Sequence, residues 1–171
     1  ETGLPIGIVG TPTSEVIAHW RHSLKSGGVF STLLAEAGAT LDIGRIGSWA
    51  RWNPRLELGR RFDTRFYIAQ YDGDHPLLPD PDEAVEPRWI SAQNAIDEAR
   101  NGLCSIIFPT MRNLERLAIC ESFEAARNLV RRYPVETISP TIETDADGTD
   151  WLCIPQDRGY PVTRQSLAEI L

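Results

Sequence analysis

The sequence contains no long apolar run, no basic stretch and no initial Met. Because about 20 consecutive apolar residues are needed to span a membrane, and a signal peptide needs a basic start before an apolar segment, we expect neither in this sequence. A formal net charge of −7 argues against a protein that binds nucleic acid through its phosphates. We therefore expect a cytoplasmic protein with no membrane or nucleic-acid partner, whose first residue is a cut within a longer chain.

Cysteine and histidine are scarce and widely spaced. No two cysteines form a CxxC pair, and the histidines do not join them in a zinc-like pattern. The sequence therefore predicts buried, reduced thiols and no zinc centre. The residues concerned are Cys104, Cys120, Cys153, His19, His22 and His75.

The composition is that of one globular domain, with 42% hydrophobic and 24% charged residues, and we expect a single domain over 1–171. Its first element is a helix, with Thr11 as N-cap and Pro12 in the first turn. The helical spacing of apolar residues is weakened at Gly27-Gly28 and resumes until Gly38. Residues 11–38 are therefore predicted to form two short helices or one broken helix.

Strand patterns follow. Residues 41–52 favour a pleated surface, but their apolar positions change parity after Ile43, which indicates two strands or one bent strand. Apolar and charged residues then alternate from Arg61 to Ile68, as in a half-buried strand whose apolar face begins at Phe62. Residues 72–82 hold three prolines and four aspartates and are predicted to be a loop, followed by a short strand over 85–90.

The last part of the sequence alternates between helical and extended patterns. Ser91 is expected to cap a helix that stops at Asn101-Gly102. Helical spacing returns over 110–133, with apolar residues inward and Ser122 able to cap a second piece. Asp147-Gly148 reads as a turn between strands. The fold class is therefore mixed α/β or α+β.

Several motifs, in this order, resemble one known family. Glu1-Thr2-Gly3-Leu4 matches the end of the Nudix box, G-x5-E-x7-R-E-U-x-E-E-x-G-U, where U is aliphatic. The order and spacing of the remaining motifs are similar to the Nudix subgroup that includes peroxisomal acyl-coenzyme A diphosphatases. These motifs are Trp49-Ala50-Arg51-Trp52, Arg61 to Phe66, Asp82-Glu83 with Glu86 and Trp89, Ser91 to Ala95, Pro109-Thr110, and Ile154-Pro155 through Tyr160-Pro161.

The resemblance implies a Nudix-type α/β/α sandwich with a mixed sheet, truncated at its N-terminus, in which 11–38 is a helical insertion. It implies hydrolysis of a nucleoside diphosphate linked to another group, with coenzyme A or acyl-coenzyme A as the indicated substrate. Most of the box is missing from the sequence, so the fragment alone is expected to be inactive. A Nudix-fold module that binds a nucleotide or protein without catalysis, and an unrelated α+β domain, are the alternatives.

The site residues implied by this resemblance carry charge or a flat ring. Glu1 matches a box glutamate that binds the metal in relatives, Mg²⁺ or Mn²⁺, and Glu83 is a candidate base or extra ligand, or else a solvated loop charge. Arg61 and Arg65 suit either an anion-binding wall or a structural ion-pair row. Trp49, Trp52 and Trp89 could stack on an adenine ring or belong to the core, and Trp52 is the candidate for substrate binding. A homodimer is left open.

Overall fold

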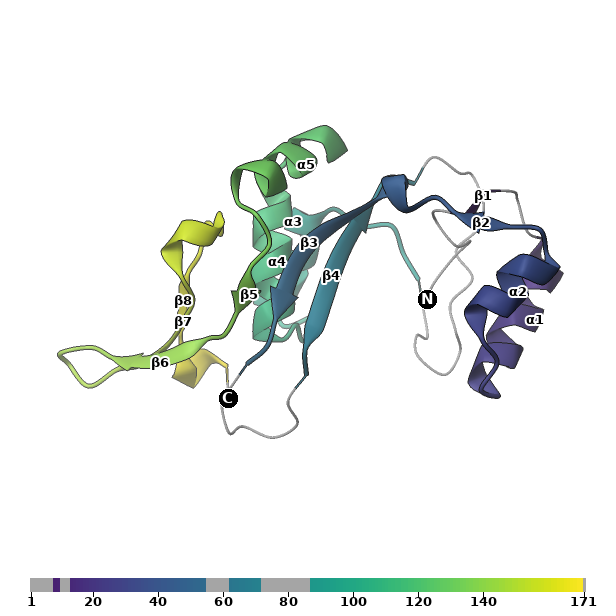
Figure 1. Cartoon of the computed structure of the whole chain (residues 1–171). Helices are drawn as coiled ribbons and strands as arrows, with labels where there is room; N and C mark the ends of the chain where they lie inside the picture. Colours follow the sequence, from purple (N-terminus) through teal and green to yellow (C-terminus); the bar gives the residue numbers. More distant parts are fainter. Residues whose placement is uncertain (1–7, 10–12, 55–61, 72–86, 171) are drawn as a thin grey trace. The chain divides into compact units, whose positions relative to one another are not determined.

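The computed structural model describes residues 8–9, 13–54, 62–71 and 87–170, which form an α+β fold, as the sequence predicts (Figure 1). The chain divides into two compact units: 1–47 with 69–89, and 48–68 with 90–171. A single domain and the status of 11–38 as an insertion stay predictions. No helix within the described ranges combines the length and the apolar composition needed to cross a bilayer.

The first unit contains the two predicted short helices. Helix α1 (Ser14–Lys25) is capped by Thr13, whose Oγ1 accepts from the Val16 amide at 3.4 Å; Thr11 and Pro12 lie outside the described residues. Gly27, at a φ of 87°, lies between α1 and α2 (Phe30–Glu36), where a side chain would be strained. The helices bury Trp20, Leu33 and Leu34. Strands β1 (Ile8–Val9) and β2 (Thr40–Leu41) pair antiparallel.

The second unit contains most of a sheet of order β4-β3-β5, formed by Thr64–Ala69, Ile46–Trp52 and Thr137–Ile138. The predicted break after Ile43 is confirmed, because a 3-10 turn at Ile43–Arg45 separates β2 from β3. The alternating pattern is confirmed as β4, whose Phe66 and Ile68 are half-buried. Phe62 precedes the strand and is 62% exposed, so it does not belong to the buried face.

Three helices lie between β4 and β5 in the chain: α3 (Ala92–Arg100), α4 (Phe108–Ala118) and α5 (Phe123–Arg132). Ser91 and Ser122 are confirmed as N-caps; each hydroxyl accepts an amide hydrogen bond at 3.1 Å. The prediction of a strand over 85–90 is wrong for residues 87–90, the part of this range that the structure describes, because they form no regular element. Residues 103–107 are also irregular and expose apolar side chains to solvent.

The C-terminal part forms a second, antiparallel sheet of order β6-β7-β8, from Thr141–Thr144, Asp150–Cys153 and Arg164–Ser166. The predicted turn is confirmed, since Gly148 has a φ of 85° between β6 and β7. Short 3-10 turns lie at Gln156–Arg158 and Leu167–Glu169. One core joins residues from β3, α4, α5 and the C-terminal segments: Trp49, Ala50, Trp52, Phe108, Ala126, Ile138, Leu152, Ile154 and Tyr160.

Candidate functional site

Three of the predicted site residues, Glu1, Arg61 and Glu83, lie outside the described residues. The other two, Arg65 and Trp52, are placed by the structure on neighbouring strands of the second unit. Arg65 is exposed on β4, whereas Trp52 is buried at the end of β3. The two side chains therefore lie in different environments, one at the surface and one in the interior.

Trp52 is a core residue. Its side chain is 1% exposed and meets the rings of Phe108 and Tyr160 edge to face, with centroids 6.0 and 5.8 Å apart. Aromatic pairs favour this arrangement because the positive ring edge meets a negative face. The predicted stacking of Trp52 on a nucleotide is therefore corrected: no exposed ring face is left for a ligand, and the core alternative describes its position. Trp49, at 3% exposed, is buried in the same way.

The charged row near Arg65 contains one strong ion pair. Asp63 accepts from Arg51 Nε at 2.8 Å and from its Nη2 at 2.6 Å, a two-point pairing of guanidinium and carboxylate. The hydrogen bonds from Arg51 hold the pKa of Asp63 below its usual value, and the charge of Arg65 acts in the same direction. Asp63 is thus neutralised from β3, and Arg65 remains exposed beside the pair.

Helix α4 buries a cluster of polar side chains that the sequence pattern did not predict. Arg112, Asn113, Glu115 and Arg116 are each between 2% and 7% exposed, whereas Leu114 and Leu117, expected to face inward, are only half-buried. A polar group inside a protein is costly unless it is paired. The cost of burying these four side chains therefore depends on their hydrogen-bond and ion-pair partners.

Arg112 and Glu115 form a buried ion pair on one turn of α4. Arg112 Nη2 donates to Glu115 Oε1 at 3.0 Å, and the Nε to Oε2 distance is 2.9 Å without hydrogen-bond alignment. Arg100 of α3 approaches the same carboxylate at 3.5 Å. Burial raises the pKa of Glu115 and lowers that of Arg112, because it penalises both charges more than their attraction compensates. An R-x-x-E spacing on one helix was the only sequence signal for this pair.

Arg116 lies on the neighbouring part of α4 and has different partners. Its Nη1 donates to the Trp49 carbonyl oxygen of β3 at 2.8 Å. Its guanidinium lies over the rings of Trp49 and Tyr160, at 4.6 and 5.0 Å from their centroids. These are cation–π contacts, which favour a guanidinium over an aromatic face. The contacts join α4 to β3 and to the segment at Tyr160.

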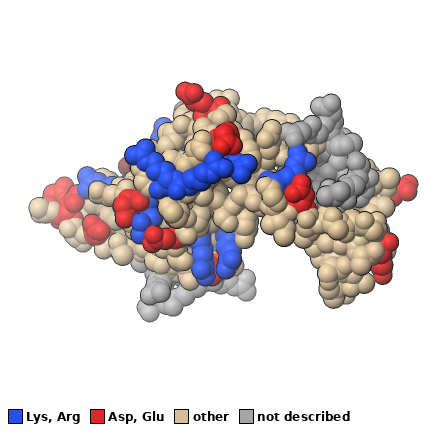
Figure 2. Space-filling model, turned by 45° about the horizontal axis from the view of Figure 1, so that its top comes forward, with Lys and Arg blue, Asp and Glu red and all other residues tan. Residues whose placement is uncertain are grey.

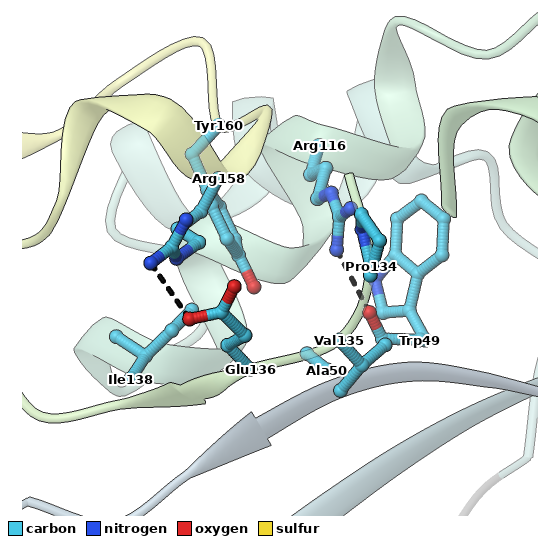
Figure 3. A pocket seen from close by; sticks show the side chains of 9 residues that line it. All are labelled: Trp49, Ala50, Arg116, Pro134, Val135, Glu136, Ile138, Arg158 and Tyr160. Carbon is cyan, nitrogen blue, oxygen red and sulfur yellow. Dashed lines mark hydrogen bonds and ion pairs between the residues drawn. The ribbon is translucent and has the colours of Figure 1, made fainter. Parts of the chain in front are cut away.

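A small hollow opens beside Arg116 (Figure 3). Arg116 reaches it from α4 and Arg158 from the C-terminal part of the chain, and its inner space fits about one water-sized particle. Arg158 donates to Glu136 Oε2 at 2.8 Å and to Asp157 Oδ2 at 2.9 Å. The hollow is too small for a nucleotide. Its lining is Trp49, Ala50, Arg116, Pro134, Val135, Glu136, Ile138, Arg158 and Tyr160.

Most charges on the molecular surface are mixed in sign. In the view of Figure 2, Lys and Arg side chains lie next to Asp and Glu at several places. Arg131 of α5, for example, pairs with Glu124 at 2.9 Å, and Arg127 lies 4.0 Å from the same residue. Such exposed pairs stabilise a fold only slightly.

The potential metal ligands are dispersed through the described parts of the chain. No group of three or more His, Cys, Asp or Glu side chains is placed to hold a metal there. The three cysteines are free thiols, and Cys104 is exposed, so the prediction of buried thiols is wrong at that position. Burial raises the pKa of Cys120 and Cys153, which are half-buried.

The chain is similar to two named hydrolases. It is 26% identical over 140 residues to nudix hydrolase 7 of Caenorhabditis elegans, covering 78% of this chain and 48% of that protein. It is 27% identical over 150 residues to the human acyl-coenzyme A diphosphatase NUDT19, covering 84% of this chain and 40% of that protein. The chain thus spans about half or less of each relative. No family model matches it. No solved structure matches it.

Proposed function

Since this chain is similar to two hydrolases over about four-fifths of its length, we propose that it is related to the Nudix hydrolases and contributes to an enzyme that cleaves the phosphoanhydride bond of a nucleoside diphosphate linked to another group. The observation that carries this proposal is similarity over about four-fifths of the chain to two proteins with hydrolase names. The ordered motifs from Trp49 to Pro161 support it independently of the box residues.

For the substrate we propose coenzyme A or an acyl-coenzyme A. The support is the name of the human relative, an acyl-coenzyme A diphosphatase, together with the motifs that resemble its subgroup. Arg61 and Arg65 are the side chains that we assign to the substrate's diphosphate. Arg65 is suited to this role because it is exposed and because the adjacent carboxylate, Asp63, is already neutralised by Arg51.

A divalent cation, Mg²⁺ or Mn²⁺, is the cofactor that we propose. When bound, such an ion polarises the phosphoryl oxygens and stabilises the charge that develops on them. Among the residues of this sequence, Glu1 matches a metal ligand of the box, and Glu83 is a second candidate as ligand or base. Neither lies in the described part, and the carboxylates that are described form no cluster that fits the ion.

We further propose that the 171-residue chain does not hydrolyse coenzyme A by itself. The physical reason is that phosphoryl transfer depends on several carboxylates that hold the metal against the diphosphate, and the box contributes only Glu1 to this sequence. One carboxylate cannot fix the position of the ion or offset the charge of the transition state.

The test compares this chain with the complete reading frame that encodes it. Each purified protein is incubated with Mg²⁺ and one substrate: coenzyme A, acetyl-coenzyme A or ADP-ribose. The products are separated by liquid chromatography and identified by mass spectrometry. We expect phosphopantetheine and adenosine 3′,5′-bisphosphate from the complete protein and neither from the chain alone. Turnover by the chain alone would overturn the proposed inactivity. Binding without turnover by the complete protein would replace the hydrolase with a binding module.

Two further properties belong to the same proposal. We propose that the enzyme acts in the cytoplasm and that 1–171 folds as one domain with 11–38 inserted. Cell fractionation tests the first property. Cooperative unfolding of the chain as a single transition tests the second, and light scattering of the purified chain shows whether it forms a homodimer.

A further inference from the structure

We infer that the hollow beside Arg116 is a binding site for one small monovalent inorganic anion of about the size of chloride. The inference is independent of the proposed hydrolase function. It rests on an unbalanced charge in the interior of the second unit, on the shape of the space next to that charge, and on the pairing of every other charged group that lines the space.

The unbalanced charge is the guanidinium of Arg116. The side chain is 2% exposed, and no Asp or Glu in the described part of the chain forms an ion pair with it. Its Nη1 has one neutral acceptor, the Trp49 carbonyl oxygen. Its Nε is buried and has no hydrogen-bond partner among the described residues. A buried cation of this kind is costly unless a negative charge lies close to it.

The neighbouring Arg112 is a buried arginine that does have an ion-pair partner. It is 4% exposed and its buried partner, Glu115, lies on the same helix face at 2.9 Å. Arg116 is buried at least as deeply, but its described partners are the Trp49 carbonyl oxygen and the faces of two aromatic rings, with no carboxylate among them. Cation–π contacts offset part of the lost hydration and do not neutralise the charge. The difference between two arginines one turn apart indicates that a partner of Arg116 comes from outside the chain.

The acidic residue at the hollow does not supply this partner. Glu136 is the single carboxylate among the lining residues, and it is 59% exposed and ion-paired with Arg158 at 2.8 Å. Arg158 also pairs with Asp157, so its charge is fully compensated. Among the lining residues two arginines face one carboxylate, and Arg116 is the arginine that has no ion pair with a described residue. Figure 3 shows Arg116 and Arg158 on the two sides of the hollow with Glu136 between them.

The size of the space decides which anion fits. Its inner part holds about one water-sized particle, so phosphate, sulfate and the carboxylate of a metabolite are too large. A halide ion is only slightly larger than a water molecule. The walls also suit a weakly hydrated ion, since Ala50, Val135 and Ile138 offer no competing donor or acceptor side chain. An anion there would cross-link α4, β3 and the 134–138 segment, and so stabilise the second unit.

The first experiment measures thermal unfolding of the full 171-residue chain in sodium chloride, sodium bromide and sodium gluconate at matched ionic strength. Above the dissociation constant, each tenfold rise in halide should raise the unfolding midpoint by roughly 3–5 °C relative to gluconate, because the halide binds only the folded chain. The halide-specific rise should be lost in Arg116→Met. It should persist in Arg131→Met, which removes an arginine that is exposed and paired with Glu124. A rise that is equal in all three salts would overturn the site.

The second experiment does not depend on whether Arg116→Met folds. Crystals of the unaltered chain are grown or soaked in bromide, and anomalous scattering is recorded at the bromine absorption edge. A bromide peak beside the Arg116 guanidinium supports the site. Ordered water in the hollow, or a Glu136 carboxylate that has turned to Arg116, would replace the anion as the partner and refute the inference.

Discussion

Replacing Arg112 by Met should destabilise the second unit strongly at neutral pH. The change leaves the Glu115 carboxylate, 7% exposed, without the guanidinium that now lies 2.9 Å away. Breaking one side of a buried ion pair costs about 3–5 kcal/mol, because the remaining charge is neither hydrated nor paired. We expect about 3 kcal/mol, at the lower end, since Arg100 stays 3.5 Å from the carboxylate and its side chain is 61% exposed.

Equilibrium unfolding in urea measures this loss, followed by circular dichroism and by the fluorescence of the buried tryptophans. The matched control is Arg131→Met, which removes an arginine from an exposed ion pair on α5 and should cost no more than about 1 kcal/mol. A second variant adds Glu115→Leu to Arg112→Met. It should recover most of the stability, because an apolar pair needs no compensating charge.

The same variant should depend on pH in a defined direction. Burial already raises the pKa of Glu115, and Arg112 opposes that rise, so removing Arg112 raises the pKa further. The folded chain then binds the proton more tightly than the unfolded chain, and stability is lost as pH rises through the folded-state pKa. The deficit of Arg112→Met relative to the wild type should therefore shrink between about pH 7 and pH 5. A deficit below about 1 kcal/mol at pH 7, or no recovery in the double variant, would refute the role of this ion pair.

Three other predictions follow from the core, a helix cap and the proposed site. Trp52→Ala should lower the free energy of unfolding by about 3–5 kcal/mol, because the side chain is buried. Trp89→Ala should lower it by less than about 1 kcal/mol, because that side chain is 71% exposed. Similar losses for the two variants in urea titrations would contradict this prediction. Ser122→Ala removes the hydroxyl that accepts from the Ala125 amide and should cost about 1 kcal/mol, with an unchanged midpoint as the opposing result. In the complete enzyme, Glu83→Gln should lower kcat by roughly 100-fold or more and leave KM nearly unchanged, as for a general base; steady-state rates equal to the wild type would make Glu83 a solvated loop charge.

Elements whose causes are local could be predicted from the sequence. Ser91 and Ser122 cap their helices because a hydroxyl placed before an apolar periodicity can accept a free amide of the first turn. Gly148 is found in its turn because only glycine adopts a φ of 85° without strain. The alternation around Phe66 predicted β4, although Phe62 lies outside the strand and is exposed.

The polar interior could not be predicted in the same way, because its causes are distant in sequence. Periodicity places Leu114 and Leu117 inward on α4, but Arg116 is buried because its acceptor is a carbonyl oxygen at Trp49. No local sequence pattern predicts a hydrogen-bond acceptor 67 positions away. The position of Trp52 was open for a related reason, since a strand tryptophan has the same local pattern in a core and in a ligand site. Glu1, Arg61 and Glu83 stay predictions.

The pairing of β3 with β5 places a constraint on how the chain acquires its structure. Arg51 lies opposite Thr137 and Trp52 opposite Ile138 in a parallel register, and Ser139 Oγ donates to the Asn53 carbonyl oxygen at 2.8 Å. During synthesis, β3 must wait until the ribosome has released the residues of β5, and during that wait the neighbouring tryptophans lack their full cover. Contacts so remote in sequence slow folding and prolong the exposure of apolar surface.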